Sequence, residues 1–212
     1  MRDTTEILII MDKSGSMGPR QADAIGGFNN FLKDQKAEPG EANLTLVQFD
    51  TTYNILYTGK PIREVEDLTE KTYRPGGGTA LNDAVARAVI ETGKRLSDTP
   101  EADRPEKVIC VIITDGEENS SREHSKEQVQ EMVKHQEEKY DWAFVYLGAN
   151  VDAFDAARQL GISADMAVNF ASSAQGVRSA YVGTSEVVRQ YRSVGKKGLA
   201  DKDARWKTEV KN

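Results

Sequence analysis

The chain has 212 residues, of which 38% are hydrophobic, and its formal net charge is -6. This composition fits one globular domain and excludes a disordered chain. Cys110 is the only cysteine, so a disulfide framework within the chain is excluded, and no apolar run approaches the roughly 18 residues of a membrane span. We find no secretory signal and expect a cytoplasmic protein.

The first half of the chain is predicted to alternate strands and helices. A short run of Ile and Leu predicts a buried strand over residues 5–11, and apolar residues recur at helical spacing over residues 21–35. Two strands are expected over residues 42–50 and 53–57. The link between them is too short for a helical crossover, so they must form an antiparallel hairpin. A short helix is expected over residues 64–68.

The second half repeats the alternation. The predicted elements are a helix over residues 81–96, a strand over 106–114, a charged surface helix over 125–140, a strand over 142–147, a helix over 152–159, a strand over 166–170 and a helix over 173–192. The strand over 106–114 is continuously apolar, which indicates burial on both faces. We therefore expect an α/β fold: a doubly wound, mostly parallel six-stranded sheet with one antiparallel edge strand and helices on both faces.

Basic residues gather at the C-terminal end. Residues 189–212 contain eight Lys or Arg and three Asp or Glu, so they carry +5 and the rest of the chain carries -11. We expect a domain over residues 1–192 and a basic tail over residues 193–212. A solvated tail is the simpler interpretation. The alternative is an arm that docks on an acidic surface, such as that of a second subunit, with Trp206 as anchor; the oligomeric state stays open.

Three predicted loops carry oxygen donors at strand ends or helix starts. Asp12, Ser14 and Ser16 follow the first strand, Thr79 precedes a helix, and Asp115 follows the strand over 106–114. Because ligands of such sheets bind outside the carboxyl ends of the strands, two carboxylates and three hydroxyls should converge there. Oxygen donors select a hard divalent cation, first Mg²⁺, with Mn²⁺ or Ca²⁺ as alternatives. Neutral hydroxyls leave that cation able to accept an acidic oxygen from outside.

At these residues the sequence resembles the von Willebrand factor A (vWA) domain family. Its metal-ion-dependent adhesion site (MIDAS) has the pattern DxSxS, then Thr, then Asp, which Asp12, Ser14, Ser16, Thr79 and Asp115 match in order. The resemblance covers about residues 4–170 and implies a vWA/Rossmann-like fold. It also implies that the three hydroxyls coordinate the metal directly and that the carboxylates act largely through water. The whole chain looks like small stand-alone domains of bacteria and phages.

The resemblance implies a metal-dependent protein-binding module, an adaptor whose bound Mg²⁺ accepts an Asp or Glu of a protein partner. Neither a nucleic acid nor a membrane is expected as a partner, and no catalytic residue is predicted. Two alternatives stay open: a Mg²⁺-dependent hydrolase at the same site, with Glu117 as the nearest candidate base, or a metal that only ties the loops together. Taken singly, each of the five residues could also be a turn former or helix cap.

Other sequence motifs fit their usual ligands poorly. The Gly-rich segment 76–79 lacks the Lys of a phosphate-binding loop, and residues 12–23 place Met17 where a Ca²⁺ loop needs Gly. His124 and His135 would lie ~16 Å apart along one helix and cannot share a metal. Three further residues follow strand ends and are expected to cap loops, with a place at the rim of the site as the alternative: Asn119, Asn150 and Asp152.

Overall fold

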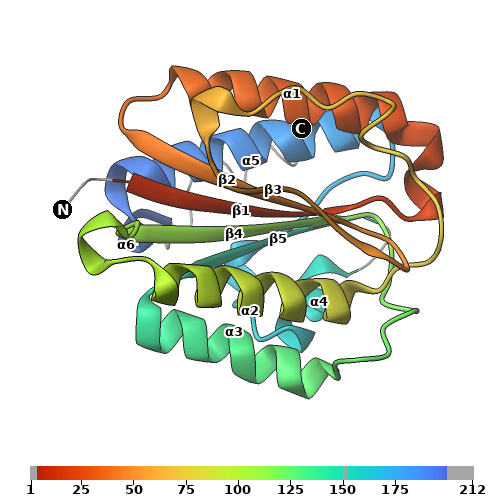
Figure 1. The fold of residues 1–212 in the computed structure, drawn as a ribbon. Helices are drawn as coiled ribbons and strands as arrows, with labels where there is room; N and C mark the ends of the chain where they lie inside the picture. The colour runs from red at the N-terminus through yellow and green to blue at the C-terminus, as the bar shows by residue number, and fades with distance from the viewer. Residues whose placement is uncertain (1–3, 150–151, 200–212) are drawn as a thin grey trace.

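The computed structural model describes residues 4–149 and 152–199, which form a twisted sheet between two layers of helices (Figure 1). The strands are β1 (Thr4–Asp12), β2 (Glu41–Phe49), β3 (Tyr53–Pro61), β4 (Lys107–Thr114), β5 (Ala143–Gly148) and β6 (Ala167–Asn169). Their order in the sheet is β3-β2-β1-β4-β5-β6. Only β3 runs antiparallel to its neighbour, and the other pairs are parallel. The predicted fold class is confirmed.

The centre of the sheet is the core of the protein. In β1, Ile7 pairs with Leu44 of β2 and Ile109 of β4, and all three side chains are fully buried. Central parallel strands are covered on both faces, which explains their continuous apolar sequence. At the edge, β3 is largely half-buried or exposed, in keeping with its single neighbour.

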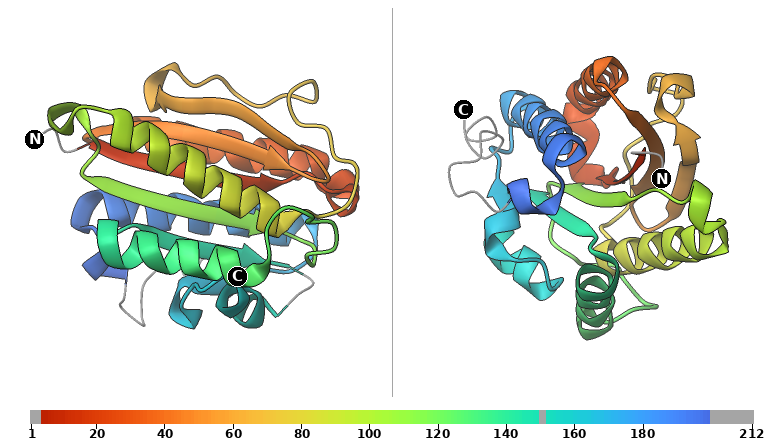
Figure 2. Two further views of the ribbon diagram at one scale, coloured as in Figure 1. Left: turned by 60° about the horizontal axis from the view of Figure 1, so that its bottom comes forward. Right: turned by 90° about the vertical axis from the view of Figure 1, so that its left-hand side faces the viewer.

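Helices cover both faces of the sheet. They are α1 (Gln21–Ala37), α2 (Leu81–Asp98), α3 (Lys126–Tyr140), α4 (Ala153–Gln159), α5 (Ala174–Val194) and α6 (Lys196–Leu199). Figures 1 and 2 show α1 and α5 on one face and α2, α3 and α4 on the other. Short 3-10 turns add η1 (Gly15–Arg20), η2 (Ile62–Glu64), η3 (Glu101–Asp103) and η4 (Ala164–Met166). The parallel strands all end at the right-hand edge of Figure 1, where the polar loops meet.

The predicted helix over residues 64–68 is wrong. The chain makes only the short turn η2 and then runs extended from Val65. Side chains of α1 bind the backbone there in place of intrahelical bonds. Asn29 accepts from the Leu68 amide at 2.7 Å and donates to the Leu68 carbonyl at 3.0 Å, while Lys36 donates to the Val65 carbonyl at 2.6 Å. This tertiary pairing outweighs local helix propensity.

Residues 193–199 complete α5 and form α6. Leu199 is fully buried, and Lys196 lies 3.7 Å from the Glu137 carboxylate of α3. The rest of the predicted basic tail, residues 200–212 with Trp206, lies outside the described residues, so its docking on an acidic surface stays a prediction. None of the helices in the described ranges combines the length and apolar character needed to cross a bilayer.

Candidate metal centre

Main-chain hydrogen bonds join two of the three predicted loops. The Gly15 amide donates to the Gly77 carbonyl at 3.0 Å, and the Gly76 amide donates to the Lys13 carbonyl at 2.8 Å. Gly77 has φ +67°, and a Cβ there would lie 2.8 Å from Oγ1 of Thr51. Only glycine takes this backbone conformation readily at such close approach. The glycine loop therefore holds the loop that follows β1 by its backbone.

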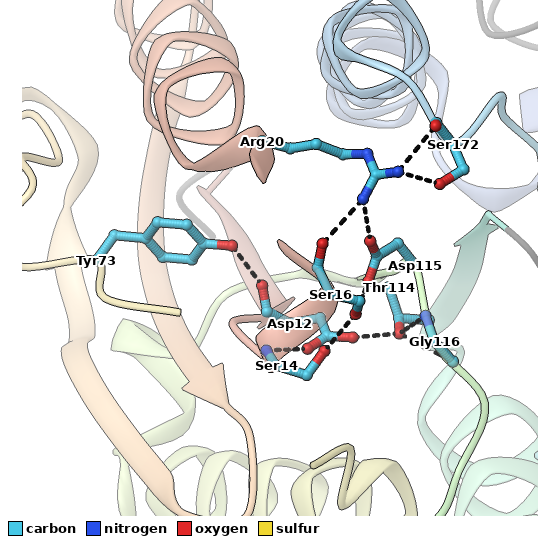
Figure 3. Close-up of polar contacts among 9 residues, drawn as sticks. All are labelled: Asp12, Ser14, Ser16, Arg20, Tyr73, Thr114, Asp115, Gly116 and Ser172. Carbon is cyan, nitrogen blue, oxygen red and sulfur yellow. Dashed lines mark hydrogen bonds and ion pairs between the residues drawn. The ribbon is translucent and has the colours of Figure 1, made fainter. Parts of the chain in front are cut away.

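Asp12, the last residue of β1, is held at both carboxylate oxygens (Figure 3). Its Oδ1 accepts from the Ser14 amide and its Oδ2 accepts from the Thr114 hydroxyl, each at 2.6 Å. The Tyr73 hydroxyl donates to the Asp12 carbonyl at 2.7 Å. Asp12 is only 1% exposed, so these contacts fix its orientation beneath the rim.

A chain of hydroxyls links the first loop to the loop after β4. Oγ of Ser14 lies 3.0 Å from Oγ of Ser16, and Ser16 donates to Oδ1 of Asp115 at 2.6 Å (Figure 3). Asp115 is 2% exposed, as is Ser14, whereas Ser16 is exposed. Residues 99 positions apart are thus within direct contact.

Thr79, in the loop before α2, lies at the same rim as the loop after β1 and the loop after β4. Its amide donates to Oδ1 of Asn119 at 2.9 Å, and its carbonyl accepts from the Asn119 amide at 3.0 Å. A Cβ on Gly116 would lie 2.9 Å from Oγ1 of Thr79 and 3.8 Å from Oγ of Ser16. The absence of a side chain at Gly116 thus leaves room between these two hydroxyls. The structure brings all five predicted residues to one rim.

Burial is the largest influence on Asp12 and raises the pKa of its carboxyl. Hydrogen bonds from Thr114 and Ser14 oppose this shift, and the nearby charge of Asp115 adds to it. Two partly desolvated carboxylates that repel each other are the arrangement that a cation stabilises most.

The donor set fits a hard divalent ion. It combines the carboxylates of Asp12 and Asp115 with three hydroxyls, and every donor atom is oxygen. Within the described residues, no group of three or more His, Cys, Asp or Glu is placed to hold a metal, so a cation at this rim would depend on the hydroxyls. Oxygen donors of this kind suit Mg²⁺, Mn²⁺ or Ca²⁺.

Sequence reasoning missed Arg20, at the end of η1. Its Nη1 donates to Oδ2 of Asp115 at 3.0 Å and to the Ser16 carbonyl at 2.9 Å, while Nη2 donates to the Ser172 carbonyl at 2.8 Å (Figure 3). No local pattern marks an arginine that acts across the fold. Thr114 was also missed, although its position directly before Asp115 in a buried strand was a usable signal.

Of the remaining candidates, only Asn119 contacts one of the five rim residues through a bond described above. Asp152 caps α4 by accepting from two amides of that helix, and Asn119 holds Thr79 as described. Glu117 is exposed. His124 lies 3.5 Å from the Asp83 carboxylate. His135 packs against the ring of Tyr140, and Cys110 is buried in β4. Asn150 lies outside the described residues.

Comparisons with known proteins give a family and a fold for the chain. A family model described as the von Willebrand factor type A domain matches residues 6–188. Proximal thread matrix protein 1 from the mussel byssus, solved with a zinc-occupied MIDAS motif, has a TM-score of 0.60 at 17% identity, covering 89% of this chain and 46% of that one. Manganese-loaded TRAP protein from Plasmodium vivax has a TM-score of 0.52 at 18% identity, covering 76% and 62%.

An archaeal structure, the ArnB paralog VWA2 from Sulfolobus acidocaldarius, has a TM-score of 0.53 at 16% identity, covering 86% of this chain and 45% of that one. A search of curated proteins gives no significant match. The chain spans about half the length of the byssus protein, and likenesses at these identities establish the fold. The family match over most of the chain shows that it belongs to the von Willebrand factor type A domain family.

Proposed function

We propose that the protein is a metal-dependent protein-binding module that accepts an Asp or Glu side chain of a partner. Mg²⁺ would be held by the five rim residues: Asp12, Ser14, Ser16, Thr79 and Asp115. The observation that carries this proposal is the division of burial at the rim: the two carboxylates are at most 2% exposed, whereas Ser16 is exposed. An approaching anion therefore meets the neutral hydroxyl of Ser16 before it meets negative charge. Bound Mg²⁺ supplies a positive centre that takes oxygen ligands from outside the protein.

The other side chains at the rim orient the donors. Asn119 holds the backbone of Thr79 from both sides, and Thr114 holds Oδ2 of Asp12. Arg20 contacts Oδ2 of Asp115 while Ser16 contacts Oδ1. Preset orientation of this kind reduces the entropy lost when the cation and partner bind.

Two solved structures of this fold support a divalent cation, since one has a zinc-occupied MIDAS motif and the other is loaded with manganese. Magnesium is our proposal for this chain because all donors are hard oxygens. Neither histidine supports the hydrolase alternative, for which the exposed Glu117 remains the nearest candidate base. His124 contacts Asp83 and His135 packs on Tyr140, and neither contact involves the five rim residues. A cytoplasmic location stays a prediction.

Calorimetric titration with Mg²⁺ tests the site. Wild-type protein should give saturable heats, and Asp12→Ala should give none. Ser97→Ala, an exposed serine in the last turn of α2, serves as the matched control and should bind normally. Equal heats in wild type and Asp12→Ala would overturn the site assignment.

Affinity capture then tests the function. Proteins retained in Mg²⁺ should be released by EDTA, retained again when Mg²⁺ is restored, and absent from Asp12→Ala. Masking the partner's carboxyl groups by amidation should also abolish retention. Retention that ignores EDTA, together with a Mg²⁺-dependent gain in thermal stability, would favour the purely structural metal. Phosphatase turnover that Asp115→Ala abolishes would favour the hydrolase.

A further inference from the structure

A cavity of about 350 Å³ lies beside the metal-centre loops. Its walls come from the start of α2, the loop after β4, Tyr146 of β5, and α4. Gly116 lines this cavity and also lies against the hydroxyl of Thr79. The cavity is thus a neighbour of the rim, and none of the five rim residues is among those that line it.

Four carboxylates line the cavity: Glu117, Glu118, Asp152 and Asp155. No Lys or Arg of the described ranges lines it. Neutral N–H groups hold two of the carboxylates: Glu118 accepts from the Asn82 amide at 2.8 Å and Asp152 accepts from the Phe154 amide at 3.0 Å. Arg158, outside the lining, pairs with Asp155. The wall therefore keeps an excess of negative charge.

Tyr146 supplies the second observation. Its side chain is fully buried in the wall of the cavity, and its hydroxyl has no hydrogen-bond partner in the part of the chain that the structure describes. Buried hydroxyls are almost always paired, because an unpaired one has lost its hydrogen bonds to water without replacement. Tyr146 is thus a residue of the cavity wall that carries an unpaired hydrogen-bonding group.

We propose that this cavity binds the basic side chain of a protein partner, an arginine in preference to a lysine. A guanidinium has only donors, which complements a wall of carboxylate acceptors and a phenol oxygen. Its planar fork can bind a carboxylate through two bonds, whereas an ammonium acts as a point charge. A partner that presents both an acidic residue to the rim and an arginine to the cavity is an extension that rests on the proposed function. The arginine site itself does not depend on the proposed function.

The test uses methylguanidinium chloride as probe, with methylurea as its neutral counterpart of similar shape. Each is titrated into the full chain in EDTA while ¹H–¹⁵N spectra are recorded. Methylguanidinium should shift the amides of Gly116, Ala156 and Gln159 in a saturable manner, and methylurea should leave them in place. Binding should persist in Asp12→Ala, so a failure here is distinguishable from a failure of the metal site.

Three variants complete the test. Tyr146→Phe removes the unpaired hydroxyl without disturbing a contact, so it should fold normally and raise the dissociation constant about fivefold. Glu117→Gln removes an exposed charge and should have a similar effect. Glu101→Gln, in η3, is the matched control and should bind as wild type does. Equal shifts with methylurea, or unchanged binding in both cavity variants, would overturn the proposal.

Discussion

The Arg20 guanidinium donates to Oδ2 of Asp115 at 3.0 Å, and the Ser16 hydroxyl donates to Oδ1 of the same carboxylate at 2.6 Å. Arg20 also reaches the Ser172 carbonyl before α5. One carboxylate of the candidate metal centre therefore already has a positive partner within the protein, and this partner connects η1, the loop after β4 and the loop before α5.

Replacing Arg20 should strengthen metal binding. A bound divalent cation and the guanidinium are like charges near one carboxylate, so Arg20→Gln removes a repulsion of about 1 kcal/mol and should raise Mg²⁺ affinity about fivefold in calorimetry. Arg74→Gln is the control, because Arg74 is exposed and its guanidinium Nε donates to the Glu70 carbonyl. Weaker Mg²⁺ binding in Arg20→Gln would mean that orientation of Asp115 outweighs the repulsion.

The space at Gly116 gives a second prediction. In Gly116→Ala, the new methyl group would lie 2.9 Å from Oγ1 of Thr79 and should displace that hydroxyl. We expect Mg²⁺ affinity to fall about tenfold, which corresponds to about 1.4 kcal/mol, with little change in melting temperature. Gly76→Ala is the control from the same rim, since a Cβ there has nothing within 4 Å. An unchanged affinity in Gly116→Ala would exclude Thr79 as a donor.

Adjacent glycines of α1 should respond oppositely to alanine. A Cβ on Gly27 would lie 2.4 Å from Cδ2 of Tyr181, a buried residue of α5, whereas one on Gly26 meets nothing within 4 Å. Gly27→Ala should destabilise the fold by about 1–3 kcal/mol through overpacking. Gly26→Ala should stabilise it by about 0.5–1 kcal/mol through helix propensity. Urea unfolding measures both, and equal effects would contradict the α1–α5 packing.

Glu6 gives a prediction for pH dependence. Burial raises the pKa of this β1 carboxyl, against the opposing charge of Arg95 and a hydrogen bond from Thr45. Between the ordinary pKa of 4.5 and the raised value, the folded state keeps a proton that the unfolded state has lost. The free energy of unfolding contributed by Glu6 therefore falls as pH rises through that window.

Glu6→Gln cannot titrate, so its stability relative to wild type should rise with pH through the same window. Denaturant unfolding from about pH 4 to pH 8 measures this difference. The control is Glu101→Gln, in the exposed turn η3, whose difference from wild type should not follow that course. A stability difference for Glu6→Gln that does not change with pH would refute the assigned shift.

The hydrophobic periodicity of the sequence was sufficient to predict the sheet. Continuous apolar strands indicated burial on both faces, and the three-residue link after β2 required an antiparallel neighbour, which β3 is. Alternation of these strands with amphipathic helices then predicted the layers. The rim followed from topology, because parallel strands release their loops at one edge.

Contacts between distant segments could not be predicted in this way. Arg20 and Asp115 are 95 positions apart, and their pairing depends on where η1 points. The extended chain after η2 depends on side chains of α1 that bind its backbone. The unpaired hydroxyl of Tyr146 depends on how α4 packs beside β5. None of these features has a local signature, since each is decided by tertiary structure.

The hydrogen bonds between the first loop and the glycine loop are made by peptide groups, at Lys13, Gly15 and residues 76–77. Mutation replaces side chains and leaves peptide groups in place. Exposed neighbours such as Pro19 and Arg74 can therefore change while the coordinating atoms stay in register. Residues that would contact the proposed partner can therefore be exchanged without replacing those that would hold the ion.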